Sequence, residues 1–213
     1  MAARDYGQYC GLTRALELVG ERWALLIVRD LLVGPRRYGE LAAGLPRIPS
    51  NILATRLKEL QADGIIRRAP RSRVIVYELT PYGRELEPVV LALGAWGFKA
   101  MGDPREEQIV TPDSMTMALR TAFQPQVAAE LPATAYGARF GPADLLVRVD
   151  GPVLEVTRGE GTVDLAFAAG PGIRRLISGE LAPEQAIATG VVEVLSGSRE
   201  LLRRFADTFH LAA

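Results

Sequence analysis

Residues 48–60, with the sequence IPSNILATRLKEL, predict an amphipathic helix whose two faces differ in kind. At about 100° per residue, one narrow sector of this helix is apolar and consists of Leu53, Leu57 and Leu60. The opposite sector consists of Asn51, Thr55 and Lys58. An ordinary solvent-facing helix surface favours Ala, Glu and Lys. The small hydrogen-bonding residues therefore indicate a binding face, and an exposed face without any function is the alternative.

The residue types on that face suit the edges of DNA base pairs. Asparagine can pair with adenine through two hydrogen bonds, threonine can bond a base edge or touch a thymine methyl group, and lysine reaches guanine or phosphate. Small side chains near the N-terminal end would also let the helix lie deep in a major groove. Arg56 falls at the flank of this face, where it would contact a phosphate or a structural partner.

The neighbouring segments predict a helix-turn-helix followed by a β-hairpin. Three helical segments come first, at residues 13–19, 23–32 and 38–43. Two short helices joined by a turn rich in Gly and Pro, the second polar on its outer face, are the order of a helix-turn-helix. Residues 65–79 then alternate as a β-hairpin does, and PRSR at 70–73 forms its basic tip.

A hairpin directly after a candidate recognition helix is typical of a winged-helix domain. Arg71 and Arg73 at its tip would hold phosphate or enter a minor groove, which sets register rather than sequence preference. Residues 36–73 hold nine basic and three acidic residues, and this local charge of +6 would attract a polyanion. A solvated basic surface is the alternative. The predicted DNA-binding residues are Arg36, Arg37, Arg47, Ser50, Asn51, Thr55, Arg56, Lys58, Arg71 and Arg73.

Five local features of the first half occur together: an early cysteine, G-x-R-W at 20–23, GPRRY-x-EL at 34–41, L-x-x-RL-x-EL at 53–60 and LT-x-x-GREL at 79–86. With them, about residues 9–100 resemble the HxlR-type winged-helix regulators, relatives of the MarR group. The resemblance implies a homodimeric transcriptional regulator that binds a pseudo-palindromic operator in double-stranded DNA. Family members often begin the recognition helix with Ile-Ser-Pro, whereas this chain has Ile-Pro-Ser at 48–50, so Ser50 or Asn51 is expected to cap the helix.

The segment 81–101 carries more apolar residues at helical spacing than a small winged-helix core needs. Together with the first helix it is predicted to form the subunit interface, as the resemblance also implies. The residues are Leu12, Leu16, Leu86, Val90, Leu93 and Trp96. Packing against a second domain is the alternative, and the two need not exclude each other.

The second half predicts a separate α+β domain. The polar residues 105–112 are the expected linker, so the chain is expected to have two domains, 1–104 and 113–213. Helices are predicted at 115–123, 172–178, 183–189 and 198–209, and strands around 145–149, 154–156, 163–167 and 191–195. Asp150-Gly151 and residues 159–161 are predicted to be hairpin turns. Strands followed by helices suggest an α+β sheet with one covered face.

The sequence from VLEVTRGEG through LISGE, AIATG and SGS to the last helix carries a second resemblance. Over about residues 113–210 the chain is similar to sterol carrier protein type 2-like domains. The similarity implies a sheet curled over helices around an apolar tunnel for a lipid-like or other small hydrophobic effector. The candidate ligand-binding residues are Met117, Phe123, Phe140, Leu165, Phe167, Leu176 and Ile177. For any single one of Leu165, Phe167, Leu176 and Ile177, filling the core is the favoured interpretation.

Composition argues against several function classes. Apolar residues make up 48% of the chain and charged residues 23%, without the roughly 18-residue apolar run of a membrane span. No secretory signal is apparent, so a cytoplasmic location without a membrane partner is expected. One histidine and one cysteine cannot form a Cys/His metal cluster, and no nucleophile elbow, P-loop or dinucleotide fingerprint occurs. We expect neither catalytic residues, nor a metal, nor a cofactor, and no enzyme activity.

The leading hypothesis is a sequence-specific, dimeric DNA-binding regulator that a hydrophobic ligand in the second domain modulates. The alternative is a redox-sensing regulator that acts through Cys10, with a second domain that serves only oligomerisation or protein docking. In some HxlR-type proteins a cysteine at the position of Cys10 acts as a redox switch, as the resemblance implies, but inert packing of this residue is the favoured interpretation. A lipid-transfer protein fits the basic patch poorly.

Overall fold

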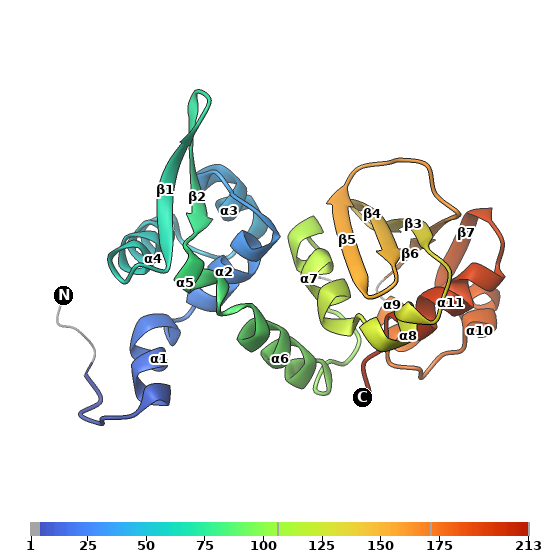
Figure 1. The fold of residues 1–213 in the computed structure, drawn as a ribbon, viewed down its shortest axis with the longest axis horizontal. Helices are drawn as coiled ribbons and strands as arrows, with labels where there is room; N and C mark the ends of the chain where they lie inside the picture. The colour runs from blue at the N-terminus through green and yellow to red at the C-terminus, as the bar shows by residue number, and fades with distance from the viewer. Residues whose placement is uncertain (1–4, 106, 171, 213) are drawn as a thin grey trace. The chain divides into compact units, whose positions relative to one another are not determined.

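The computed structural model describes residues 5–105, 107–170 and 172–212. The chain divides into two compact units, Met1–Val90 and Leu91–Ala213, here called the N-terminal and the C-terminal unit (Figure 1). None of the described helices is long and apolar enough to cross a membrane. The predicted domain limits at residues 104 and 113 stay predictions.

The N-terminal unit contains the predicted helices and the predicted hairpin. Its elements are α1 (Gly11–Val19), α2 (Ala24–Val33), α3 (Tyr38–Gly44), α4 (Ser50–Ala62), β1 (Ile66–Arg71), β2 (Val74–Leu79) and α5 (Pro81–Arg84). The predicted apolar sector of α4 is confirmed, because Leu53, Leu57 and Leu60 are at most 2% exposed. These leucines fix which face of α4 is turned to solvent.

The prediction that Ser50 or Asn51 caps α4 is wrong. The N-cap residue is Pro49, and no side chain makes a capping hydrogen bond. The carbonyl of Pro49 accepts the first helical hydrogen bond, from the amide of Leu53 at 2.9 Å. Ser50 is therefore already the first residue of the helix, too far along the chain to act as its cap.

Strands β1 and β2 form an antiparallel hairpin in which Arg67 lies opposite Glu78 and Arg71 opposite Val74. The turn between them contains Ser72 in the left-handed region, at φ 55°. The backbones of Arg36 and Tyr77 also exchange two hydrogen bonds, of 2.9 and 2.7 Å, so β2 is fastened to the chain on its other side. In Figure 1 the hairpin projects beyond the helices, as a wing does.

The apolar spacing over residues 81–101 predicts one helix that starts at Pro81, but the segment forms two helices. Thr80 caps α5 through its side chain. The next helix is α6 (Glu87–Phe98). The physical reason is Pro88, which has no N–H to donate to the carbonyl four residues before it and so cannot continue a helix from α5. Only the first four residues of α6 belong to the N-terminal unit.

The C-terminal unit is built on a five-stranded sheet. Its helices are α7 (Pro112–Ala122), α8 (Pro125–Ala129), α9 (Ile173–Ile177), α10 (Pro183–Ala188) and α11 (Glu200–Thr208). Its strands are β3 (Thr134–Phe140), β4 (Ala143–Asp150), β5 (Val153–Arg158), β6 (Leu165–Ala169) and β7 (Val192–Gly197). The order is β5-β4-β3-β6-β7, with only β3 and β6 parallel. The α+β class is confirmed for this unit.

Two features of this sheet differ from the predictions. The hairpin turn at Asp150-Gly151 forms, but the one at residues 159–161 does not, because β5 and β6 are not neighbours. The chain instead crosses from the edge strand β5 to the far side of β3, where β6 pairs with it in parallel. Strand β3 and helix α8 were not predicted. The sequence of β3, TAYGARF, has small residues at alternate positions, which weakens the strand signal.

Aromatic side chains fill the interior between the sheet and α11. The ring of Phe205 lies 5.3 Å from that of Tyr136, 4.9 Å from that of Phe167 and 4.6 Å from that of Phe209, measured between centroids. All four residues are fully buried. The core of this unit therefore joins the C-terminal helix to strands β3 and β6.

Candidate nucleic-acid interface

The polar face of α4 is turned to solvent. Asn51 and Lys58 are exposed, and Thr55 is half-buried between them along the helix. The hydroxyl of Thr55 donates a hydrogen bond to the carbonyl of Asn51, with an Oγ1 to O distance of 2.9 Å. This bond uses the hydroxyl proton, so Thr55 presents an acceptor oxygen and a methyl group to whatever binds there.

Arg56 is turned towards the protein rather than to solvent. Its side chain is 13% exposed and its Nη2 lies 2.8 Å from Oε2 of Glu21, in the connection between α1 and α2. Its Nη1 pairs with Glu59, one turn further along α4. Arg56 therefore fastens α4 to the segment after α1. That Arg56 contacts DNA stays a prediction. The geometry favours the alternative, in which Arg56 pairs with residues of its own domain.

The other predicted basic contacts lie around the start of α4. Arg37 and Arg47 are exposed, whereas Arg36 is half-buried and donates from Nη1 to the carbonyl of Pro35 at 2.9 Å. The hydroxyl of Tyr38, at the start of α3, donates to the carbonyl of Ser50 at 2.9 Å. This bond connects the two helices of the predicted helix-turn-helix at the end where bases would be read.

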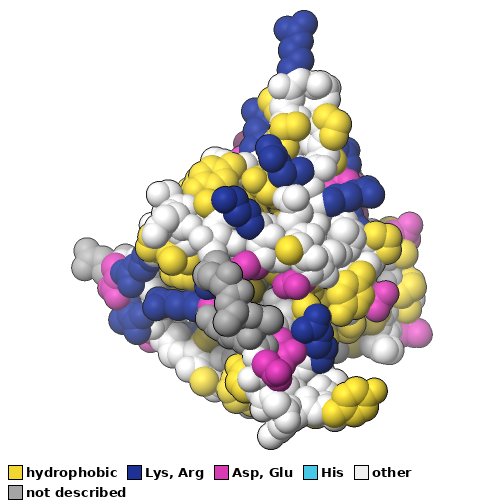
Figure 2. Space-filling view, turned by 90° about the vertical axis from the view of Figure 1, so that its left-hand side faces the viewer, with side chains coloured by type: hydrophobic (Ala, Val, Ile, Leu, Met, Phe, Trp, Pro, Cys, Tyr) yellow, Lys and Arg dark blue, Asp and Glu magenta, His cyan; other side chains and the backbone are white. Residues whose placement is uncertain are grey.

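The wing carries basic side chains, and a carboxylate among them. Arg73 at the turn and Arg68 on β1 are exposed, whereas Arg67 and Arg71 both donate to Glu78. The hydrogen bonds from Arg71 and then Arg67 hold the pKa of Glu78 below its usual value. Figure 2 shows Lys and Arg side chains on the projecting tip and on the surface just below it.

Sequence reasoning had not placed Arg67, Arg68 or Glu78 in the site. A signal was available, since Glu78 follows Val74 and Val76 in the buried alternation of β2 and lies opposite Arg67 in the register. A carboxylate at an apolar strand position needs a cationic partner. To identify this partner, the strand register must be known, and the register depends on the position of the turn.

The residues predicted for a subunit interface are mostly exposed. On α1, the exposed fractions of Leu12 and Leu16 are 70% and 44%. On α6, those of Leu93 and Trp96 are 46% and 75%, and α6 has no buried residue although its sequence is almost entirely apolar. Leu86 and Val90 are half-buried. Exposed apolar surface of this kind typically marks an interaction site.

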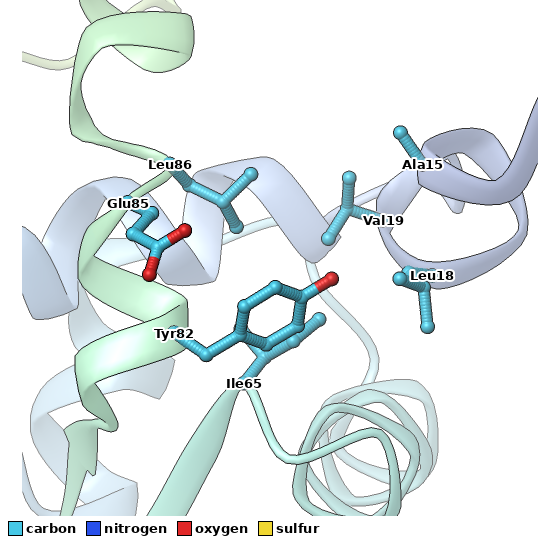
Figure 3. A pocket seen from close by; sticks show the side chains of 7 residues that line it. All are labelled: Ala15, Leu18, Val19, Ile65, Tyr82, Glu85 and Leu86. Atoms are coloured by element: carbon cyan, nitrogen blue, oxygen red, sulfur yellow. The ribbon is translucent and has the colours of Figure 1, made fainter. Parts of the chain in front are cut away.

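The N-terminal unit also has a mainly apolar pocket of about 200 Å³ beside α1. Figure 3 shows its lining, which consists of Ala15, Leu18, Val19, Ile65, Tyr82, Glu85 and Leu86. The Tyr82 ring forms one wall, and the Glu85 carboxylate is the charged group of the lining. Leu86, one of the predicted interface residues, therefore borders a hollow next to α1.

Cys10 is exposed and stands at the N-cap of α1. The backbone N–H groups of Thr13, then Leu12, at the start of α1 lower the pKa of its thiol, because N–H groups at a helix N-terminus stabilise a thiolate. A larger share of Cys10 is therefore ionised at neutral pH than of an ordinary cysteine.

The predicted ligand-binding residues mostly form part of the packed interior of the C-terminal unit. Those in its buried core are Phe140, Leu165, Phe167, Leu176 and Ile177, and Phe123 packs against it half-buried. Met117 is buried on α7 outside this cluster. Phe167 also borders a shallow hollow of about 200 Å³ beside Gly137 and Ala166. The ligand site stays a prediction.

A helix held by buried leucines, a polar face open to solvent and a basic hairpin after it define a winged helix-turn-helix DNA-binding protein. Comparison with known proteins gives the family: the HxlR-like helix-turn-helix family matches residues 18–104. The HTH-type transcriptional regulator YdeP of Bacillus subtilis is 34% identical over 93 residues, which cover 42% of this chain and 73% of YdeP. This chain belongs to the HxlR-like family and is a DNA-binding transcriptional regulator.

Two further relatives match segments of similar length. YvaP of Bacillus subtilis is 37% identical over 86 residues, which cover 39% of this chain and 80% of YvaP. Rv3095 of Mycobacterium tuberculosis is 44% identical over 94 residues, which cover 43% of this chain and 59% of Rv3095. Both carry the description of uncharacterized HTH-type transcriptional regulators. The family match itself ends at residue 104, so it concerns the N-terminal unit and α6.

Arg56 and Arg73 should behave differently when each is replaced by glutamine. Arg56→Gln removes the cation that faces Glu21 and Glu59, so it should lower the free energy of unfolding by roughly 1 to 3 kcal/mol and leave the salt dependence of DNA binding unchanged. Arg73→Gln should leave stability unchanged and make the slope of log K against log salt shallower by roughly 0.9. Urea unfolding and anisotropy titrations at several salt concentrations measure both. A shallower salt slope for Arg56→Gln would show that this guanidinium contacts phosphate.

Proposed function

We propose that this chain is a homodimeric regulator that reads a pseudo-palindromic operator with the N-terminal part of α4. The observation that carries the proposal is the division of α4 into a leucine face that is at most 2% exposed and a polar face that is turned to solvent. A recognition helix has this construction, because one face must bind its own domain while the other meets base edges.

In this proposal the side chains of α4 have separate tasks. The Asn51 amide pairs with a base edge, which in the major groove favours adenine. Thr55 offers its methyl group and an acceptor oxygen, since its proton is bonded to the Asn51 carbonyl. Lys58, one turn further, reaches guanine or phosphate. Arg37, Arg47 and Arg73 are exposed cations that would hold the backbone and set the register.

The exposed apolar side chains of α1 and α6 support the proposed homodimer. Each Å² of apolar surface removed from water contributes about 25 cal/mol, so side chains such as Leu12 and Trp96 would stabilise an interface substantially. A two-fold dimer places two recognition helices roughly 34 Å apart, one helical turn of DNA. The two-fold symmetry is the physical reason for a pseudo-palindromic operator, and the spacing sets the distance between its half-sites.

A hydrophobic effector in the C-terminal unit is the proposed modulator. Support comes from the resemblance to sterol carrier protein type 2-like domains and from a five-stranded sheet with an apolar interior between it and the helices. The proposed limits are 1–104 for the DNA-binding and dimerisation domain and 113–213 for the effector domain, with 105–112 as linker. Because α6 begins in one compact unit and ends in the other, it offers a continuous element between operator and effector.

The second candidate function is redox sensing through Cys10. The exposed thiol and its lowered pKa favour it, since the thiolate is the form that an oxidant attacks. Cys10 precedes α1, whose exposed leucines are proposed interface residues, so a bond between two Cys10 thiols would constrain the dimer. In this candidate the C-terminal unit serves only oligomerisation or protein docking.

Substitutions on α4 should change base preference rather than general affinity. Asn51→Ala should relax the preference at one position of each half-site and cost about 1 to 3 kcal/mol there. Thr55→Val keeps the methyl group and Thr55→Ser keeps the hydroxyl, so the two variants separate their contributions. Selection of bound sequences from random DNA measures the preferences, with Arg73→Gln as the control that weakens all sequences alike. Unchanged preferences in Asn51→Ala and both Thr55 variants would remove α4 from base recognition.

An effector, if bound, should survive gentle purification. Native mass spectrometry of the protein is expected to show a mass increment of a lipid-sized molecule that solvent extraction removes. Operator binding should differ between extracted and unextracted protein. Identical masses and identical binding before and after extraction would contradict the effector hypothesis and favour the docking alternative.

Oxidant response provides the test of Cys10. Under the redox hypothesis, peroxide should change operator affinity of the wild type, and Cys10→Ser should abolish this change while leaving the affinity of the reduced protein as it was. The response should weaken as pH falls below the lowered pKa of the thiol, because the thiolate is then protonated. An equal response in the wild type and in Cys10→Ser would exclude this cysteine as the sensor.

A further inference from the structure

The wing contains a carboxylate that connects two of its arginines. Oε1 of Glu78 accepts a hydrogen bond from Nε of Arg67, at 2.8 Å, and forms an ion pair with Nη2 of the same arginine, at 2.7 Å. Its Oε2 accepts a hydrogen bond from Nη2 of Arg71, at 3.0 Å. Arg67 lies opposite Glu78 in the hairpin register, and Arg71 lies four residues further along the same strand. The three side chains therefore form one cluster along β1 and β2.

The exposure of the three side chains is unequal. The side chain of Glu78 is 9% exposed, whereas those of Arg67 and Arg71 are 63% and 61% exposed. A guanidinium group has five N–H donors, and each of the two arginines donates one hydrogen bond to Glu78. The carboxylate is thus enclosed between two cations whose outer edges are open to solvent. The hairpin fixes the spacing between these two cations.

The charge of this cluster limits how strongly the wing attracts DNA. Two arginines and one glutamate carry a net charge of +1, where a neutral residue at position 78 would leave +2. Affinity for DNA of any sequence depends on the number of phosphates that the protein neutralises. A carboxylate in a basic wing therefore lowers general affinity, while it holds two cations in one arrangement that suits phosphates at a particular spacing.

We infer that Glu78 is a specificity-determining residue of the wing, which positions Arg67 and Arg71 as a fixed pair and opposes binding to DNA outside the operator. The inference rests on the proposed function, in which the wing contacts the DNA backbone. Glu78 acts through its two arginine partners and is a positioning residue. Specificity of this kind comes from weakening the wrong complexes as much as from strengthening the right one.

The test compares two duplexes of equal length, one selected from random DNA with the wild type and one unrelated. Glu78→Gln should raise affinity for the unrelated duplex roughly fivefold and steepen its slope of log K against log salt by roughly 0.9, because one negative charge near phosphate is gone. Affinity for the selected duplex should rise less, so the ratio of the two affinities should fall. Fluorescence anisotropy at several salt concentrations measures all three quantities.

Two further variants separate charge from position. Glu78→Asp keeps the charge on a shorter side chain, so it should leave the unrelated duplex unaffected and weaken binding to the selected one severalfold. Glu155→Gln, at an exposed position on β5 in the other compact unit, makes the same change in net charge outside the wing's own domain and should preserve the affinity ratio. Melting temperatures show whether each variant is folded.

An unchanged affinity ratio in Glu78→Gln, or an equal loss for both duplexes in a folded variant, would overturn the inference. If Glu78→Gln does not fold, Glu78→Asp decides, and wild-type affinity for the selected duplex would then overturn it. These failures differ from a failure of the proposed function, which would appear as a wild type that selects no sequence and shows no salt-dependent binding.

Discussion

Burial of one face of α4 is the constraint on which the rest of the structure depends. Leu53, Leu57 and Leu60 enter the core of the N-terminal unit, and a helix of 3.6 residues per turn must then present the opposite side chains to solvent. Apolar packing therefore decides the orientation of α4. In the proposed complex, this orientation decides which residues would meet DNA.

Ion pairs add to the orientation that the buried leucines give α4. Arg56 fastens the inner side of α4 to Glu21, and Glu78 gathers two arginines of the wing. In both places a residue type that suggests phosphate binding has an intramolecular partner. The number of basic residues in this segment is therefore not a count of phosphate contacts, because Arg56 is turned inward whereas Arg67 and Arg71 keep their outer edges open to solvent.

Sequence patterns predicted individual helices and strands well. They predicted the pairing of residues far apart in the chain poorly. The period of α4 and the alternation of β1 and β2 depend on neighbours in sequence, so the N-terminal helices and the wing could be predicted. The pairing of Arg56 with Glu21 and the parallel pairing of β3 with β6 join residues far apart in the chain, and no periodicity reports them. Prolines caused both the missed cap of α4, at Pro49, and the break before α6, at Pro88. The effect of a proline depends on its position in the first turn of a helix.

Chemical protection of the operator can show whether α4 lies in the major groove, because dimethyl sulfate methylates guanine N7 there. Bound protein should protect two patches about 10 base pairs apart, related by a two-fold axis, as two α4 helices in successive major grooves require. Protection of one guanine in each patch should weaken in Lys58→Ala, because Lys58 is the side chain on the polar face of α4 that reaches guanine. A single protected patch, or full reactivity of the major groove while the protein stays bound, would contradict the reading of DNA by α4.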